Sequence, residues 1–167
     1  MDKQYYPVEI EEKWSKIWAE RVISNKDSED SFSQVIPPPN VTGTLHMGHS
    51  FQYAIMDFYT RYNHMAGKDG HWKVGSDHAG IATQMVVENN LAKKDITRNE
   101  LGREKFLDEV WSWKDYSEEK ITSQIKRLGC SVDWTKYRFT IDDGYNEAVI
   151  KALVELQRTD KKYRGYR

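Results

Sequence analysis

The feature that most constrains this chain is a proline- and glycine-rich segment, PPPNVTGTLHMGH, which runs from Pro37 to His49. A run of β-forming residues from Ser31 to Ile36 comes directly before it, and a long amphipathic pattern follows it. Proline has no N–H to donate to a sheet ladder, so Pro37 is predicted to end the strand. The resulting order of strand, loop and helix N-terminus is typical of α/β proteins.

The same segment has the properties of a phosphate-binding loop. Unpaired N–H groups at a helix N-terminus and the helix dipole both favour an anion. His46 and His49 are three positions apart, so on a helix they share a face and both imidazoles can reach a phosphate chain. Gly43 and Gly48 allow a ligand close to the backbone. We therefore expect the imidazoles to donate hydrogen bonds to charge that develops in a transition state.

The segment after the loop is predicted to be a helix. Thr44 is its predicted N-cap, because threonine side chains accept hydrogen bonds from the first free N–H groups of a helix. Apolar residues recur at helical spacing from Phe51 to Met65. Gly67 stands where a glycine commonly follows a helix.

A second strand and helix are predicted next. Residues 71–74 read as a short strand that ends at Gly75, and residues 76–78 open a helix that continues to Leu91, with Asp77 as its cap. This order predicts a right-handed parallel βαβ unit. Both loops would then lie at the C-terminal ends of neighbouring strands, where open α/β sheets bind ligands.

The remaining segments read mainly as helices. A helix follows Pro7, a polar loop covers residues 24–31, and an extended run and a last helix follow residue 136. Residues 92–130 are predicted to be a helical insertion that packs on the nucleotide-binding core. Within it, a capping box at residues 97–100 starts a helix that carries Trp113, and a separate helix ends at Gly129.

His46-Met47-Gly48-His49 resembles the HIGH motif of class I aminoacyl-tRNA synthetases. Two longer stretches, Pro37 to Thr44 and Val74 to Gln84, are similar in particular to the bacterial type of valyl-tRNA synthetase. The likeness extends over essentially the whole chain and is to the N-terminal part of that family. It implies an α/β fold of the Rossmann-like class I synthetase type, in which residues 1–167 form the N-terminal half of the parallel sheet of the catalytic domain.

The resemblance also implies residue roles. Catalysis would fall to His46 and His49. The ATP-binding residues would be Asn40, Thr44, His46, Gly48 and His49. The amino-acid pocket would be lined by Pro38 and Pro39, and Asp77 would bind the α-ammonium group of the amino acid as a charge-assisted pair.

The implied reaction is attack of the valine carboxylate on the α-phosphorus of ATP, followed by transfer of the valyl group to tRNA(Val). ATP would enter with Mg²⁺, as a substrate. A Lys-Met-Ser-Lys-Ser element and the editing and anticodon-binding domains are absent from the sequence, so we expect an N-terminal fragment. Two alternatives remain open, namely an isolated nucleotide-binding module without turnover and a different nucleotidylyltransferase that uses His-x-Gly-His. The Gly75 to Gly80 element argues against the latter, because in the family it serves an amino-acid pocket.

Charge and composition argue against binding to nucleic acid through overall charge and against a protein stabilised by internal disulfides. The net charge of −1 gives no global field that would draw the chain onto nucleic acid. A local basic run at residues 161–167 is interpreted as a solvated tail, with RNA contact as the alternative. The single cysteine, Cys130, allows no internal disulfide and fits a reducing cytosol.

No metal site or membrane segment is predicted. The five histidines are scattered over several elements without the spacing of a zinc site: His46, His49, His64, His71 and His78. No apolar window approaches the length of a transmembrane helix. We therefore expect a cytoplasmic protein that is monomeric and has no membrane contact.

Overall fold

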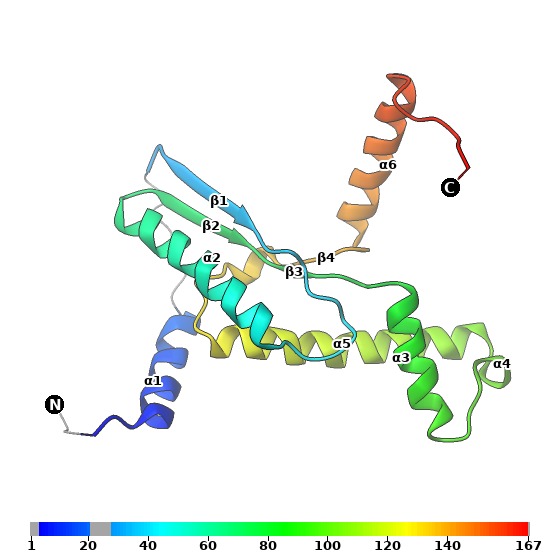
Figure 1. Ribbon diagram of the computed structural model, residues 1–167, viewed down its shortest axis with the longest axis horizontal. Helices are drawn as coiled ribbons and strands as arrows, with labels where there is room; N and C mark the ends of the chain where they lie inside the picture. The colour runs from blue at the N-terminus through cyan, green and yellow to red at the C-terminus, as the bar shows by residue number, and fades with distance from the viewer. Residues whose placement is uncertain (1–3, 21–27, 167) are drawn as a thin grey trace.

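The computed structural model describes residues 4–20 and 28–166, so residues 24–27 of the polar loop predicted at residues 24–31 lie outside the described residues. Along the chain (Figure 1) the elements are α1 (Pro7–Glu20), β1 (Ser31–Val35), α2 (Met47–Met65), β2 (Asp69–Lys73), β3 (Gly75–Ser76), α3 (Ile81–Ala92), α4 (Arg98–Leu101), α5 (Arg103–Arg127), the 3₁₀ turn η1 (Trp134–Lys136), β4 (Arg138–Phe139) and α6 (Asp143–Arg158).

The strands form two parallel pairs. In the first pair β1 lies beside β2, with Val35 opposite Lys73. In the second pair β3 lies beside β4, with Ser76 opposite Phe139. The helix α2 connects β1 to β2, so the predicted parallel βαβ unit is present and the α/β fold is confirmed.

The two pairs share one extended stretch of chain, residues 69–77. On one side of this stretch the Ile36 N–H donates to the Lys73 carbonyl at 3.0 Å. On the other side the Arg138 N–H donates to the Val74 carbonyl at 3.1 Å. The stretch therefore runs between β1 and β4, and the C-terminal ends of all three segments lie at the same edge.

The main core lies between this sheet and the helices α2 and α5. Its buried members are Ile36, Val41, Tyr53, Trp72, Val74, Ile121 and Ile125. The rings of Tyr53 and Trp72 meet edge to face at a centroid distance of 6.2 Å. Each large apolar side chain buried here contributes roughly 1.5–3 kcal/mol, so the two isoleucines of α5 attach that helix firmly to the sheet. A smaller cluster of Val87, Leu91 and Phe106 joins α3 to α5.

Both helix starts near the predicted site differ from the prediction. The N-cap of α2 is His46 and not Thr44, and the helix begins at Met47. The chain also stays extended through Gly75, which pairs in β3 where the strand was predicted to end. The next helix begins only at Ile81, so Asp77 is not its N-cap.

Residues 92–130 are helical, with different boundaries from those predicted. The capping box is confirmed: the Glu100 carboxylate accepts from the Thr97 N–H at 2.9 Å, and the Thr97 hydroxyl accepts from the Glu100 N–H at 3.3 Å. The helix it starts has only four residues, because the chain turns at Gly102 with φ +79°. After Gly102, α5 continues for 25 residues where two helices were predicted, since no helix breaker interrupts it before Gly129.

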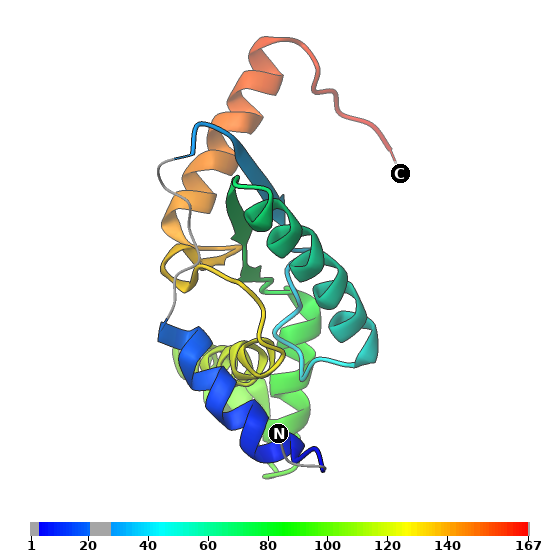
Figure 2. The same cartoon turned by 90° about the vertical axis from the view of Figure 1, so that its left-hand side faces the viewer.

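The last helix, α6, confirms its prediction and projects away from the other elements (Figures 1 and 2). None of its residues is buried, and its apolar side chains are exposed: Tyr145, Val149, Ile150, Leu153, Val154 and Leu156. Within the described ranges, no helix combines the length and the apolar character that crossing a bilayer requires.

Candidate functional site

The proline- and glycine-rich loop forms the wall of a cavity of about 420 Å³ at the C-terminal end of β1. Six of the residues to which the family resemblance assigns a role line it: Pro38, Pro39, Asn40, Thr44, His46 and His49. Ile121 of α5 and Gln52 of α2 complete part of the lining. Gly48 and Asp77 do not line the cavity. Gly48 lies between the two histidines in sequence, and Asp77 pairs through its backbone with Asn40.

The side chains of the two histidines accept hydrogen bonds from backbone N–H groups at the start of α2. The Nδ1 atom of His46 accepts from the Gly48 N–H at 3.1 Å, and the Nδ1 atom of His49 accepts from the His46 N–H at 3.2 Å. Their ring centroids are 4.0 Å apart. Because each Nδ1 accepts, the proton of each neutral ring belongs on Nε2. Each imidazole therefore has one nitrogen for the helix and one N–H donor for a ligand.

The electrostatic setting keeps His49 neutral. Burial, and then the nearby His46, lower the pKa of His49 below its ordinary value of 6.5. A neutral ring retains the Nδ1 lone pair that the His46 N–H needs. The site at neutral pH thus presents hydrogen-bond donors together with the N-terminal end of a helix, an arrangement that favours phosphate oxygens.

Gly48 is needed for the position of the His46 ring. A Cβ at residue 48 would lie 2.9 Å from Cε1 and 3.1 Å from Nδ1 of His46. Any side chain there would push the imidazole off the helix end. At Gly43, by contrast, a Cβ would meet nothing within 4 Å among the described residues.

Asp77 lies beside the loop through backbone pairing. It forms a parallel bridge with Asn40, in which the Asp77 N–H donates to the Pro39 carbonyl at 2.8 Å. The Val41 N–H in turn donates to the Asp77 carbonyl at 2.9 Å. The two loops therefore converge at one edge of the sheet, as the parallel topology predicts.

The Asp77 carboxylate is held by a turn and by a threonine from β4. Its Oδ1 accepts from the Ala79 N–H at 3.0 Å and from the Thr140 hydroxyl at 3.1 Å. The Asp77 side chain remains 36% exposed, so it can still meet a ligand. Its role in the fold is thus to stabilise the turn before α3, where Gly80 caps the helix without a side-chain hydrogen bond.

Thr140 is a site residue that the sequence analysis missed. Its hydroxyl oxygen accepts from the His78 N–H at 3.0 Å and lies 2.6 Å from the Nδ1 atom of that histidine. His78 also packs edge-on against Phe139 at 6.4 Å, so its ring is partly structural. The extended run that ends at Thr140 was predicted, but no local pattern in the sequence shows that it pairs beside β3, which is what brings the hydroxyl to Asp77.

A buried polar network lies under the Asp77 strand. The hydroxyl of Ser76, which is fully buried, donates to Oε1 of Glu118 at 2.9 Å, and Oε2 of Glu118 is 2.6 Å from the Lys114 Nζ. Burial alone would lower the pKa of Lys114, but bonds and charge attraction from Glu118 and Asp115 raise it above its ordinary value. Lys114 therefore stays charged and pairs with the carboxylate that holds Ser76.

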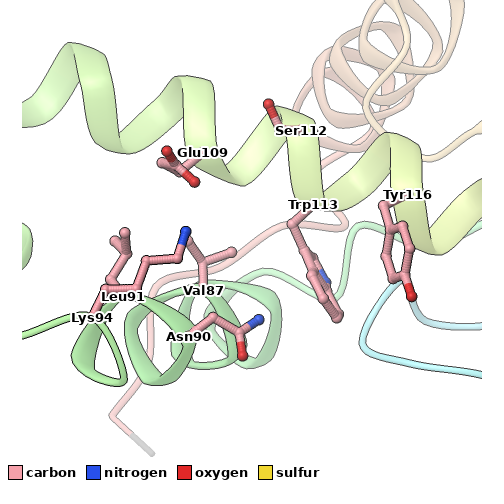
Figure 3. A pocket seen from close by; sticks show the side chains of 8 residues that line it. All are labelled: Val87, Asn90, Leu91, Lys94, Glu109, Ser112, Trp113 and Tyr116. Carbon is pink, nitrogen blue, oxygen red and sulfur yellow. The ribbon is translucent and has the colours of Figure 1, made fainter. Parts of the chain in front are cut away.

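A second cavity, of about 310 Å³, lies between α3 and α5 (Figure 3). Figure 3 shows Glu109, Trp113 and Tyr116 of α5 extending to the side on which α3 lies, whereas the Ser112 hydroxyl points away from α3; Val87, Asn90, Leu91 and Lys94 complete the lining. None of the predicted site residues lines it. Across the described ranges, no group of three or more His, Cys, Asp or Glu side chains is placed to hold a metal ion.

Comparison with known proteins assigns the class. The family model for tRNA synthetases class I (I, L, M and V) matches residues 9–167, so the chain belongs to the class I tRNA synthetases. Within that class, its curated relatives include two proteins named valine–tRNA ligase. The one from Acinetobacter baylyi is 56% identical over 164 residues, which cover 98% of this chain and 17% of the relative.

The second relative, from Francisella tularensis subsp. tularensis, is 49% identical over 170 residues, which cover 100% of this chain and 18% of the relative. The chain therefore spans less than a fifth of the length of these relatives. A solved LeuRS from Agrobacterium radiobacter K84, in a ternary complex with tRNA and LeuAMS, superposes with a TM-score of 0.70. Its identity is 21%, with 94% of this chain and 19% of that chain covered, so this likeness supports the fold.

Proposed function

We propose that this chain is the N-terminal part of the catalytic domain of a valine–tRNA ligase, with residues 92–130 as a helical insertion. The observation that carries the proposal is the 56% identity to a valine–tRNA ligase over 98% of the chain. The reaction would be activation of valine by ATP, followed by transfer to tRNA(Val). Because the matched segment is only 17% of that relative, we assign the activity to a longer protein, acting as a monomer in the cytoplasm.

The loop cavity is the proposed site for MgATP. His46 and His49 would donate from Nε2 to the phosphates, and the N-terminal end of α2 would stabilise the developing negative charge. Asn40, Thr44 and Gly48 would complete the contacts. The cavity lining offers hydroxyl, amide and imidazole groups and no carboxylate, so the Mg²⁺ would be held mainly by the phosphates of the nucleotide.

Valine is proposed to bind between the proline segment and the Asp77 turn. Pro38 and Pro39 would line an apolar pocket for the isopropyl group, and the Asp77 carboxylate would pair with the α-ammonium group. The backbone pairing of Asp77 with Asn40 supports this arrangement, because it brings the proline segment and the Asp77 turn to one sheet edge. Catalysis would come from holding the carboxylate of valine in line with the α-phosphorus of ATP, with little covalent chemistry by the protein.

The loop cavity lined by His46 and His49 is compatible with one other candidate, a nucleotide-binding module without turnover. Valine-dependent exchange of pyrophosphate into ATP decides between them, measured on the full-length protein with its editing activity disabled. We expect valine to be activated, isoleucine to be excluded by size, and threonine to be rejected by only about 10²-fold, since an apolar pocket discriminates poorly against a hydroxyl. Equal exchange with valine and leucine would contradict the proposed specificity, and ATP binding without any exchange would favour the module.

A further inference from the structure

The long helix α5 lies against the candidate phosphate loop and bonds its backbone. Figure 1 shows the connection from β1 to α2 reaching α5. The Trp113 Nε1–H donates to the carbonyl oxygen of Val41 at 2.9 Å. One helical turn further on, the Ser117 hydroxyl donates to the carbonyl oxygen of Gly43 at 3.1 Å.

A third bond from the same helix completes the series. The Leu45 N–H donates to Oε1 of the Gln124 side chain at 2.9 Å. Residues 41, 43 and 45 of the loop are thus each bonded to a side chain of α5. The next residue is His46, so the third bond fixes the backbone directly before the first imidazole.

The three side chains form one stripe on the helix. Positions 113, 117 and 124 are separated by four and seven residues, which places them within about 40° of one another around the helix axis. Ile121 and Ile125 beside them are buried in the main core, and Ser117 is only 1% exposed. A polar stripe therefore interrupts an apolar contact face at the place where the loop crosses it.

The loop needs these partners. Residues 41–45 belong to neither a helix nor a strand, so their backbone groups, apart from the Val41 N–H that bonds Asp77, have no regular ladder to pair with. Buried backbone groups in such segments are almost always satisfied by side chains or water. Here helix α5, more than 65 residues away in sequence, supplies the partners.

We propose that Trp113, Ser117 and Gln124 are positioning residues, which fix the loop backbone so that His46 and His49 face MgATP in the reactive orientation. This inference rests on the proposed function. It extends that function to three side chains of α5 whose bonding atoms contact the loop backbone and neither valine nor ATP. A displacement of about 1 Å at a reacting group can lower a rate by roughly a hundredfold, so anchoring of this kind would appear in kcat.

Two pairs of variants and one control test the proposal. Ser117→Ala removes a hydroxyl donor, whereas Ser117→Thr keeps it. Gln124→Met removes the acceptor at similar side-chain length, whereas Gln124→Glu keeps an acceptor oxygen. Ser123→Ala is the matched control, because the Ser123 hydroxyl bonds the Lys120 carbonyl of its own helix at 2.8 Å.

Two measurements on the full-length protein are required. Hydrogen–deuterium exchange of the peptide that contains residues 41–46 reports on the loop, and valine-dependent pyrophosphate exchange gives kcat and KM. For Ser117→Ala and Gln124→Met we expect at least about fivefold faster deuterium uptake and a roughly tenfold lower kcat, with KM for valine changed by less than about twofold. Ser117→Thr and Gln124→Glu should restore both quantities, and Ser123→Ala should alter neither.

Unchanged deuterium uptake in Ser117→Ala and Gln124→Met would overturn the proposal. So would an equal loss of kcat in the conservative variants, because the retained donor or acceptor would then not be what sustains catalysis. Gln124 is partly exposed, so its variants decide the matter if Ser117→Ala unfolds. If the wild-type protein shows no valine-dependent exchange, the proposed function fails, while deuterium uptake still decides whether α5 fixes the loop.

Discussion

Each histidine of the loop serves the helix with one ring nitrogen and leaves the other for a ligand. The Nδ1 atoms of His46 and His49 accept backbone N–H groups at 3.1 and 3.2 Å. An alanine at either position would therefore remove a helix cap together with any phosphate contact. An asparagine keeps an acceptor oxygen close to the Nδ1 position and removes the Nε2 donor, so it separates the two roles.

Asp77→Asn separates charge from hydrogen bonding in a similar way. The asparagine Oδ1 can still accept from the Ala79 N–H and the Thr140 hydroxyl, so we expect the thermal unfolding midpoint to hold. The proposed charge pair with the valine ammonium would be lost, and such bonds contribute about 1.5–3 kcal/mol, so KM for valine should rise at least about tenfold. Pyrophosphate exchange measures this, with KM for ATP as the control. A lower midpoint together with normal valine binding would leave Asp77 a purely structural residue.

Tyr53 should limit stability at alkaline pH. Burial raises its pKa from 10.0 to about 12, and its buried hydroxyl has no hydrogen-bond partner among the described residues. Between these two values the unfolded chain loses the proton while the folded chain keeps it, so stability falls as pH rises through the window. Urea unfolding at about pH 8 and about pH 11 should show this fall, and a smaller one in Tyr53→Phe. An identical fall in both proteins would assign the effect to other groups, such as Cys130, whose pKa burial also raises to about 12.

At the scale of elements, the pairing of β3 with β4 depends on a glycine. A Cβ at Gly75 would overlap the carbonyl oxygen of Arg138 in the neighbouring strand. We expect Gly75→Ala to separate the strands, to move Thr140 away from Asp77 and to destabilise the fold by about 1–3 kcal/mol. Chemical unfolding measures the loss. Gly43→Ala, where a Cβ would meet no described atom within 4 Å, should change stability by less than about 0.5 kcal/mol, and equal losses would refute the steric explanation.

Elements with local signals could be predicted from the sequence. The strand before Pro37, the apolar stripe of α2, the Thr97 capping box and the last helix all follow from neighbouring residues. Helix starts at the site could not be predicted in this way. Thr44 has a better intrinsic preference for the N-cap than histidine, yet the adjacent Leu45 N–H is held by Gln124, and the helix starts two residues later.

The same explanation applies to Asp77 and to α5. Asp77 is a good local cap, but its backbone pairs with Pro39 and Val41, so the chain remains extended there. The continuous helix was predicted as two because the polar residues around Ser117 weaken the apolar pattern. Those polar residues bond the loop and β3, and such contacts between distant segments leave no periodic signal in the sequence.

At the scale of the whole molecule, parallel strand order brings the predicted residues together. It sets the loop after β1 beside the turn after β3, and the sequence analysis anticipated this convergence from the βαβ pattern. The contributions of α5 and of Thr140 complete the site from the second half of the chain. The described residues thus bring together one connected candidate site, within less than a fifth of the length of the valine–tRNA ligase relatives.

The central claim is that the loop after β1 binds ATP through its two imidazoles. The most direct test is calorimetric titration of MgATP into the wild-type protein and into the double variant His46→Asn/His49→Asn, with thermal unfolding of both as the control. Two lost donors to phosphate, each contributing about 1.5–3 kcal/mol, should weaken ATP binding by at least about tenfold, while the retained caps keep the unfolding midpoint. An ATP affinity that is the same in both proteins would contradict the account.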